Sequence, residues 1–124
     1  MSDTRRVQAE ELRKHQLREQ DRAIKAIRWA CIRSGYTLAV HGTRSRDLDL
    51  IAVPWVDDAE TVGQLLKRIR AAGFTVSTPE KKPHGRLAYV VHRDEHRDLG
   101  ADYIDLSVTA RQPSRRTTTP RRKP

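Results

Sequence analysis

Two short apolar runs that flank a Gly-Thr turn and a closely spaced pair of aspartates constrain this chain more than any other feature. Residues 38–55 read LAVHGTRSRDLDLIAVPW, and the pattern predicts β-strands over 36–41 and 47–53. Asp47 and Asp49 are two residues apart, so in a strand both side chains project from the same face. Neighbouring carboxylates repel each other unless a cation lies between them, and Mg²⁺ binds through one or two carboxylates plus substrate phosphates. The pair therefore predicts a divalent-cation site.

The turn between these strands has the residues of a phosphate-binding loop. Gly42 lets the backbone approach an anion closely, and Thr43 offers a hydroxyl and an N–H. Arg44 and Arg46, inside the turn, could neutralise phosphate charge. A phosphate cradle beside a carboxylate pair indicates a protein that handles a nucleoside triphosphate. We expect His41, directly before the turn, to be buried and bonded to the backbone rather than catalytic.

The remaining sequence predicts helices and further strands around this stretch. Uninterrupted helix-forming residues predict a helix over 4–34, and a regular apolar stripe predicts another over 58–72, capped by Asp57 or Asp58. Apolar residues on both faces of the strand at 47–53 predict a central strand that is covered on both sides. Further strands are expected from residue 74, over 87–92 and over 102–108, with a loop at 78–85.

The predicted N-terminal helix is long for so small a protein. As one helix, residues 4–34 would run about 45 Å at ~1.5 Å per residue. It must therefore either break near Gln20 or protrude with its mostly charged front half. A solvated extension, a helix-to-helix contact with a second copy or a partner chain, and a basic arm on nucleic acid all fit this composition.

Charge and cysteine content limit the classes of function. The 124 residues carry a formal net charge of +9, of which residues 111–124 supply +6, and the body of the chain is left with +3. The single cysteine, Cys31, excludes an internal disulfide and fits a reducing cytoplasm. No apolar run approaches membrane-spanning length and the first residues lack a signal core, so we expect a cytoplasmic protein with no membrane partner.

The central motif also carries a family resemblance. Gly42-Thr43 followed by Asp47-x-Asp49 at the start of an apolar strand resembles the nucleotidyltransferase superfamily that includes DNA polymerase beta. The segments HGTRSRDLDLIAVPW, KKPHGRLAY and YIDLSV are similar to short nucleotidyltransferase-like proteins of bacteriophages, which would place the protein in the bacterial host cytoplasm. The resemblance implies a minimal nucleotidyltransferase fold of α/β (α+β) class. It would have a mixed central sheet of about four to five strands, a long N-terminal helix and one further helix. The division is then an N-terminal helix (1–34), a core (35–110) and a basic tail (111–124).

The resemblance implies roles for three carboxylates. Asp47 and Asp49 would hold two Mg²⁺ ions, with Mn²⁺ as a substitute, and Asp105 would help bind one and activate the attacking hydroxyl. Alternation with Ile104 and Leu106 places Asp105 on the polar face of its strand. The alternative is that Asp105 caps a turn or pairs with an arginine.

Two basic segments complete the predicted site. Lys82, His84 and Arg86 lie in a cation-rich loop that would neutralise the triphosphate, unless the loop is merely solvated. The tail is expected to be disordered when free and to contact RNA or DNA, or else to solubilise the protein or dock another one. Its cations are Arg111, Arg115, Arg116, Arg121, Arg122 and Lys123.

Three functions compete at this point. The favoured one is an Mg²⁺-dependent nucleotidyltransferase that moves a nucleoside monophosphate from a triphosphate to an acceptor, either nucleic acid or protein. The second is a module of the same fold that binds nucleotide or nucleic acid without turnover and needs a partner chain. The third is a metal nuclease, because Asp49 with Glu80-Lys81-Lys82 offers an Asp…Glu-x-Lys pattern. It is disfavoured because we expect Glu80 on a loop.

Overall fold

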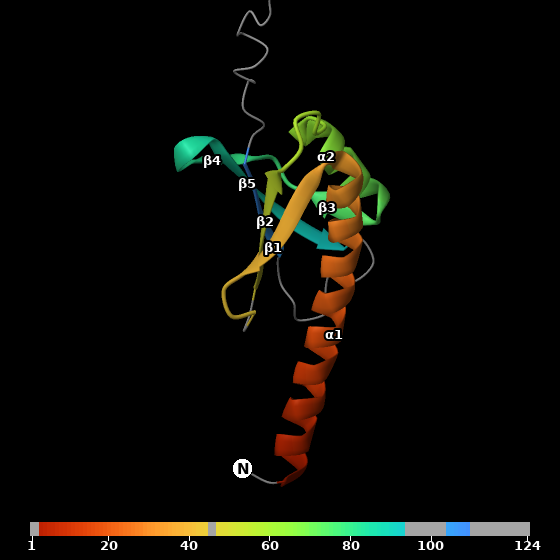
Figure 1. The fold of residues 1–124 in the computed structure, drawn as a ribbon. Helices are drawn as coiled ribbons and strands as arrows, with labels where there is room; N and C mark the ends of the chain where they lie inside the picture. Colours follow the sequence, from red (N-terminus) through yellow and green to blue (C-terminus); the bar gives the residue numbers. More distant parts are fainter. Residues whose placement is uncertain (1–2, 45–46, 94–103, 110–124) are drawn as a thin grey trace, which may run out of the picture.

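The computed structural model describes residues 3–44, 47–93 and 104–109, which form two helices and one mixed sheet (Figure 1). The elements are α1 (Asp3–Ser34), β1 (Tyr36–His41), β2 (Leu48–Pro54), α2 (Val62–Ala71), β3 (Phe74–Val76), β4 (Glu80–Lys82), a 3₁₀ turn (Pro83–Gly85), β5 (Arg86–Arg93) and β6 (Ile104–Thr109).

The sheet follows the order β1-β2-β6-β5-β3, and β4 also pairs with β5. Strands β2 and β6 are parallel, whereas the other neighbours are antiparallel. This arrangement confirms the predicted α+β class with a mixed sheet, a long N-terminal helix and one further helix. The prediction of a loop over 78–85 is wrong for residues 80–82, which form β4 and pair with β5.

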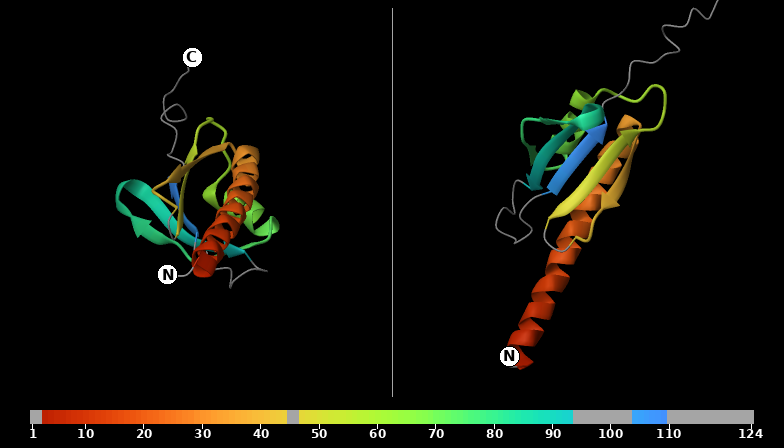
Figure 2. Two further views of the ribbon diagram at one scale, coloured as in Figure 1. Left: turned by 90° about the horizontal axis from the view of Figure 1, so that it is seen from below. Right: turned by 90° about the vertical axis from the view of Figure 1, so that its left-hand side faces the viewer.

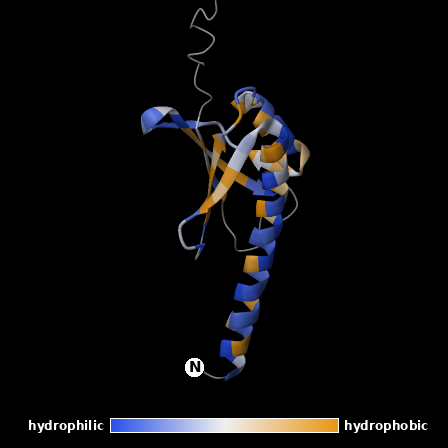
Figure 3. Ribbon diagram, viewed as in Figure 1, coloured by the Kyte–Doolittle hydropathy of each residue, from blue (hydrophilic) through white to orange (hydrophobic). Residues whose placement is uncertain are grey.

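Both helices lie on one face of the sheet (Figure 2, right). Leu50 of β2 and Leu106 of β6 point to that face and are buried with Ile27 of α1 and Leu65 of α2. The hydropathy colouring shows the apolar residues of the strands and of the upper part of α1 gathered where these elements meet (Figure 3). The prediction that β2 is covered on both sides is wrong for the described residues, because Val53 on the opposite face is 36% exposed.

Helix α1 is continuous over 32 residues, so it does not break near Gln20. At ~1.5 Å per residue it is about 48 Å long, and its front half extends beyond the sheet (Figure 1). Val7 and Leu12 on that half are exposed. Gly35 ends the helix with φ +85°, and a Cβ there would lie 2.7 Å from Val56 Cγ2, so the position requires glycine. Among the described residues, no helix is long and apolar enough to span a membrane.

Helix α2 begins at Val62, four residues later than predicted, and neither Asp57 nor Asp58 caps it. Thr61 is the N-cap instead: its Oγ1 accepts a hydrogen bond from the backbone N–H of Gln64 at 3.2 Å. The Gln64 side chain accepts one in return from the Thr61 N–H at 3.2 Å, which completes a capping box.

Glu60, just before this cap, joins the two helices. Its carboxylate accepts hydrogen bonds from Arg68 Nε and Nη2, both at 2.9 Å, and from Ser34 Oγ at 2.9 Å. These bonds from Arg68 and Ser34 lower the pKa of Glu60 to about 2. The network fixes the end of α1 against α2.

Candidate active site

A row of four residues crosses the sheet on the face that the helices leave open. His41 of β1 is the register partner of Asp49, Asp49 of β2 is the partner of Asp105, and Asp105 of β6 is the partner of Val90. Adjacent strands are about 4.8 Å apart, so the parallel register places the carboxylates of Asp49 and Asp105 side by side. Asp49 is half-buried and Asp105 is exposed.

The pKa of Asp105 is raised by loss of hydration and in part by the neighbouring Asp49. Partial loss of hydration raises the pKa of Asp105, and the charge of Asp49, a hydrogen bond with the Asp49 carboxyl and the charge of Asp47 raise it further. Lys82 acts in the opposite direction. Because Asp105 remains open to solvent, its loss of hydration is incomplete, and the adjacent Asp49 is the specific feature of the site. A cation between these carboxylates would relieve their repulsion.

Asp47 stands apart from this pair. Strand β2 begins at Leu48, so Asp47 lies in the bend before the strand rather than within it. Its charge acts on Asp105, yet among residues 3–44, 47–93 and 104–109 no three His, Cys, Asp or Glu side chains form a group that could hold a metal ion. The structure therefore brings Asp49 and Asp105 together and leaves Asp47 as a more distant charge. Two carboxylates fit a magnesium ion whose other ligands are substrate phosphates and water.

The Gly-Thr turn lies directly against Asp49. Gly42 has φ +79°, and a Cβ built on it would lie 3.3 Å from Asp49 Oδ2. The left-handed backbone and the close carboxylate both favour glycine at this position. Thr43, which follows, is exposed. The backbone of the predicted phosphate turn is thus next to the carboxylate pair.

Arg44 holds this turn on α1. Its guanidinium donates to Gln20 Oε1 at 2.9 Å, to Asp21 Oδ1 at 2.9 Å and to the Leu17 carbonyl at 3.3 Å. Arg13 Nη2 in turn donates to the Arg44 carbonyl at 3.0 Å. Arg44 has φ +62° and acts here as a positioning residue, so its direct contact with a phosphate stays a prediction. Arg46 lies outside the described residues.

A cavity of about 340 Å³ opens beside Asp105, between β4, β5 and β6. Lys82 lines it, and its Nζ pairs with Glu80 at 3.4 Å; its contact with a triphosphate stays a prediction. His84 and Arg86 are not among its lining residues: His84 is exposed in the 3₁₀ turn with φ +66° and Arg86 is half-buried at the start of β5. The polar residues Ser77, Thr78 and Ser107 also line the cavity.

Sequence reasoning missed several of these residues. The expectation for His41 was wrong, because its side chain is exposed next to Asp49. Ser107 could have been found, since it lies two residues after Asp105 on the same face of the strand. Ser77 and Thr78 could not be recognised from the sequence, because they reach the cavity only through the pairing of β4 with β5. The six tail cations at 111–123 lie outside the described residues.

The comparisons with known proteins rest on structure alone, since no family model and no curated protein matches the sequence. The Cid1 poly(U) polymerase, solved with MgGTP bound, matches 76% of this chain at a TM-score of 0.55 and 17% identity. The chain has a nucleotidyltransferase fold. JHP933 from Helicobacter pylori matches 77% of this chain at 16% identity and a TM-score of 0.40. The chain spans 32% of the Cid1 polymerase and 44% of JHP933. The resemblance to bacteriophage proteins stays a prediction.

Proposed function

We propose that this protein is a divalent-metal-dependent nucleotidyltransferase that transfers a nucleoside monophosphate from a triphosphate to an acceptor hydroxyl. The observation that carries this proposal is the pairing of Asp49 with Asp105 in adjacent parallel strands, with the Gly42 turn against Asp49. A phosphate-binding backbone next to two carboxylates supplies the two elements that a metal-bound triphosphate needs.

Each group has a defined task in this proposal. Asp49 and Asp105 would hold Mg²⁺, with Asp47 adding negative charge nearby. The cation, when bound, neutralises charge on the phosphates during an in-line displacement. The N–H groups of Gly42 and Thr43 contact phosphate oxygens, and Lys82 adds a positive charge at the cavity beside Asp105. The cavity, at about 340 Å³, has the volume of a small-ligand site and would take the nucleoside.

The reaction is a substitution at the α-phosphorus. The acceptor oxygen forms a bond to that phosphorus, the bond to the oxygen that bridges to the β-phosphate breaks, and pyrophosphate leaves. Asp105 takes the proton of the acceptor hydroxyl.

The Cid1 polymerase supports this proposal, because its name describes nucleotide polymerisation and its structure holds MgGTP. This chain spans 32% of that polymerase, so the likeness covers only part of the neighbour. The second candidate, a binding module without turnover, is favoured by the position of Asp47 outside β2, which leaves two rather than three carboxylates together among the described residues.

The nuclease alternative needs a new assessment. It was disfavoured because Glu80 was expected on a loop, and that expectation is wrong. Glu80 and Lys82 lie on β4 and line the cavity with Asp105. However, the Glu80 side chain is 73% exposed and pairs with Lys82, and it is not among the charges that shift the pKa of Asp105. Glu80 therefore stays apart from the carboxylate pair, and the nuclease remains the weakest candidate.

The test is incubation of the full chain with each α-labelled nucleoside triphosphate, Mg²⁺ and a cell extract. The proposal predicts a labelled acceptor and released pyrophosphate, both absent for Asp49→Asn and Asp105→Asn. Asp58→Asn, an exposed aspartate before α2, is the matched control and should retain activity. Triphosphate binding without label transfer would favour the binding module, and shortened nucleic acid would favour the nuclease.

A further inference from the structure

The only two tryptophans of the chain are both exposed, away from the carboxylate pair. The side chains of Trp29 on α1 and Trp55 after β2 are 58% and 70% exposed, and Ile32 between them is 58% exposed. Tryptophan is a highly buried residue on average, so two exposed indoles on one small domain indicate a binding surface.

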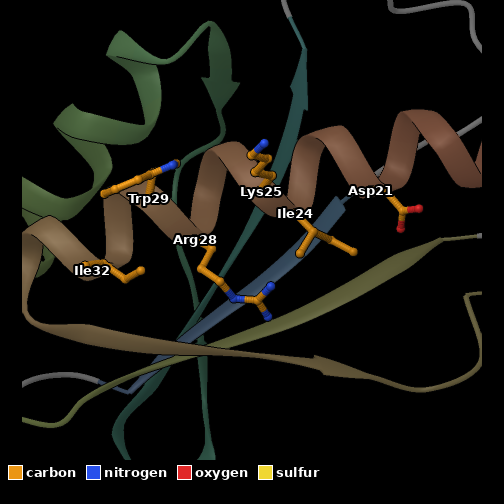
Figure 4. Close-up of a pocket in the computed structure, with 6 residues that line it drawn as sticks. All are labelled: Asp21, Ile24, Lys25, Arg28, Trp29 and Ile32. Carbon is orange, nitrogen blue, oxygen red and sulfur yellow. The ribbon is translucent and has the colours of Figure 1, made fainter.

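These residues line two adjoining hollows, one formed by side chains of α1 alone and one between α1 and β1, an edge strand of the sheet. One hollow of about 260 Å³ is lined by Asp21, Ile24, Lys25, Arg28, Trp29 and Ile32 (Figure 4). A second hollow of about 420 Å³ is lined by Arg28, Ile32, Tyr36, Thr37, Leu38 and Trp55. Because Arg28 and Ile32 line both, we treat the two hollows as one feature, the α1–β1 groove.

The α1 side of this groove carries positive charge. Lys25 and Arg28 line it, and residues 22–34 of the helix contain no acid. Asp21, at the end of the groove, is already paired with Arg44 at 2.9 Å. In Figure 4 the Arg28 side chain reaches from α1 toward β1, and it donates a long hydrogen bond of 3.4 Å to the Leu38 carbonyl. A polyanion that follows the groove would meet positive charge along α1.

We propose that the α1–β1 groove binds single-stranded nucleic acid, with bases stacked on Trp29 and Trp55 and phosphates on Lys25 and Arg28. Aromatic faces that alternate with cations are the features by which proteins bind single strands without sequence preference. An acidic peptide would use the cations but gains less from two exposed indoles. Asp57 and Asp58, two and three residues after Trp55, would end the path of the strand.

This inference does not depend on nucleotidyl transfer. Thr37 and Trp55 are separated from the carboxylate pair by most of the length of β1, because its other end, His41, is the register partner of Asp49. The groove is also distinct from the basic tail, which contains no aromatic residue to stack on a base. Stacking therefore distinguishes binding in the groove from charge neutralisation by the tail.

The tryptophans themselves provide the assay. The full chain is titrated with an oligothymidylate and, in parallel, with an abasic oligonucleotide of the same length and charge. We expect the oligothymidylate to quench tryptophan fluorescence and to bind at least about fivefold more tightly than the abasic strand. Equal affinity for both strands with unchanged fluorescence would overturn the proposal and leave the tail as the binding element. Equal quenching by polyglutamate would overturn it in favour of an acidic protein partner.

Variants then test the individual residues. Trp29→Ala and Trp55→Ala should each weaken binding of the oligothymidylate about fivefold or more and leave the affinity for the abasic strand unchanged. Lys25→Ala should weaken both strands, whereas Lys67→Ala, at an exposed position on α2, is the matched control and should weaken neither more than slightly. Circular-dichroism melts check that each variant is folded. Wild-type affinity in both tryptophan variants would also refute the proposal.

Discussion

Substitution of Gly42 by alanine tests whether the Gly-Thr turn does more than reverse the chain. The position has φ +79°, and the new Cβ would lie 3.3 Å from Asp49 Oδ2. A left-handed conformation costs a non-glycine residue about 1–2 kcal/mol. The methyl group would in addition press on the carboxylate and fill the space through which a phosphate approaches the backbone.

Gly73→Ala is the matched control. Gly73 has φ +101°, and a Cβ there would have no atom within 4 Å, so this variant carries backbone strain without a new contact. Both variants should unfold more easily by about 1–2 kcal/mol, which corresponds to roughly 4–8 °C in Tm for each kcal/mol in a domain of this size.

The discriminating assay is binding of a fluorescent nucleoside triphosphate in the presence of Mg²⁺. Gly42→Ala should lose affinity on the order of tenfold, because hydrogen bonds to a charged phosphate contribute about 1.5–3 kcal/mol and the methyl group disturbs them. Gly73→Ala should bind like the wild type. If both folded variants bind the triphosphate with wild-type affinity, the turn is structural only and the phosphate-cradle argument is refuted.

Three further predictions concern the surroundings of the site. Arg44→Ala should lower the free energy of unfolding by about 1–2 kcal/mol in a denaturant melt, since three hydrogen bonds to α1 are lost; an unchanged melt would remove Arg44 as the anchor of the turn. The pKa of Glu60 is lowered to about 2, so its bonds to Arg68 stabilise the fold above pH ~4.5 and are lost as the pH falls toward 2. Glu60→Gln should therefore melt lower than the wild type at pH 7 and lose less stability between pH 5 and pH 2.5 in thermal melts; parallel pH profiles would contradict this. Removal of residues 111–124 should weaken nucleic-acid binding and flatten its salt dependence in anisotropy titrations while tryptophan quenching persists, and an unchanged salt slope would give the tail another role.

The residue pattern predicted the local features of the site, whereas the meeting of Asp49 with Asp105 was expected only from the family resemblance. The alternation of Asp49 with its apolar neighbours agrees with the structure, in which Leu48 and Leu50 are buried and Asp49 lies on the opposite face. The register of β2 with β6, which puts Asp49 beside Asp105, joins segments more than fifty residues apart, so no local pattern encodes it. The same applies to Arg44, whose partners on α1 are more than twenty residues away.

The start of α2 and the position of β4 were predicted wrongly for different reasons. The start of α2 follows Thr61-Val62-Gly63-Gln64, which has the Thr-x-x-Gln spacing of a capping box, whereas Asp57 and Asp58 are only favourable cap residues in isolation. Strand β4 is too short and too charged to be recognised, because Glu80–Lys82 is exposed and forms a strand only through pairing with β5.

The most direct test of the central claim is a set of thermal melts of Asp49→Asn, Asp105→Asn and the control Asp58→Asn, with and without Mg²⁺ and a triphosphate. The raised pKa of Asp105 means that the folded state binds its proton more tightly than the unfolded state, so the ionised pair destabilises the metal-free fold as the pH rises through that pKa.

At pH 7 without metal, each site variant should therefore melt higher than the wild type, in proportion to the ~0.2–1 kcal/mol of repulsion between like charges on facing strand positions. Mg²⁺ with triphosphate at a hundred times its Kd should stabilise the wild type and Asp58→Asn by about 2.7 kcal/mol and leave both site variants unchanged. If Asp49→Asn and Asp105→Asn melt lower without metal and still gain wild-type stability from Mg²⁺ and triphosphate, the two carboxylates do not form the proposed site.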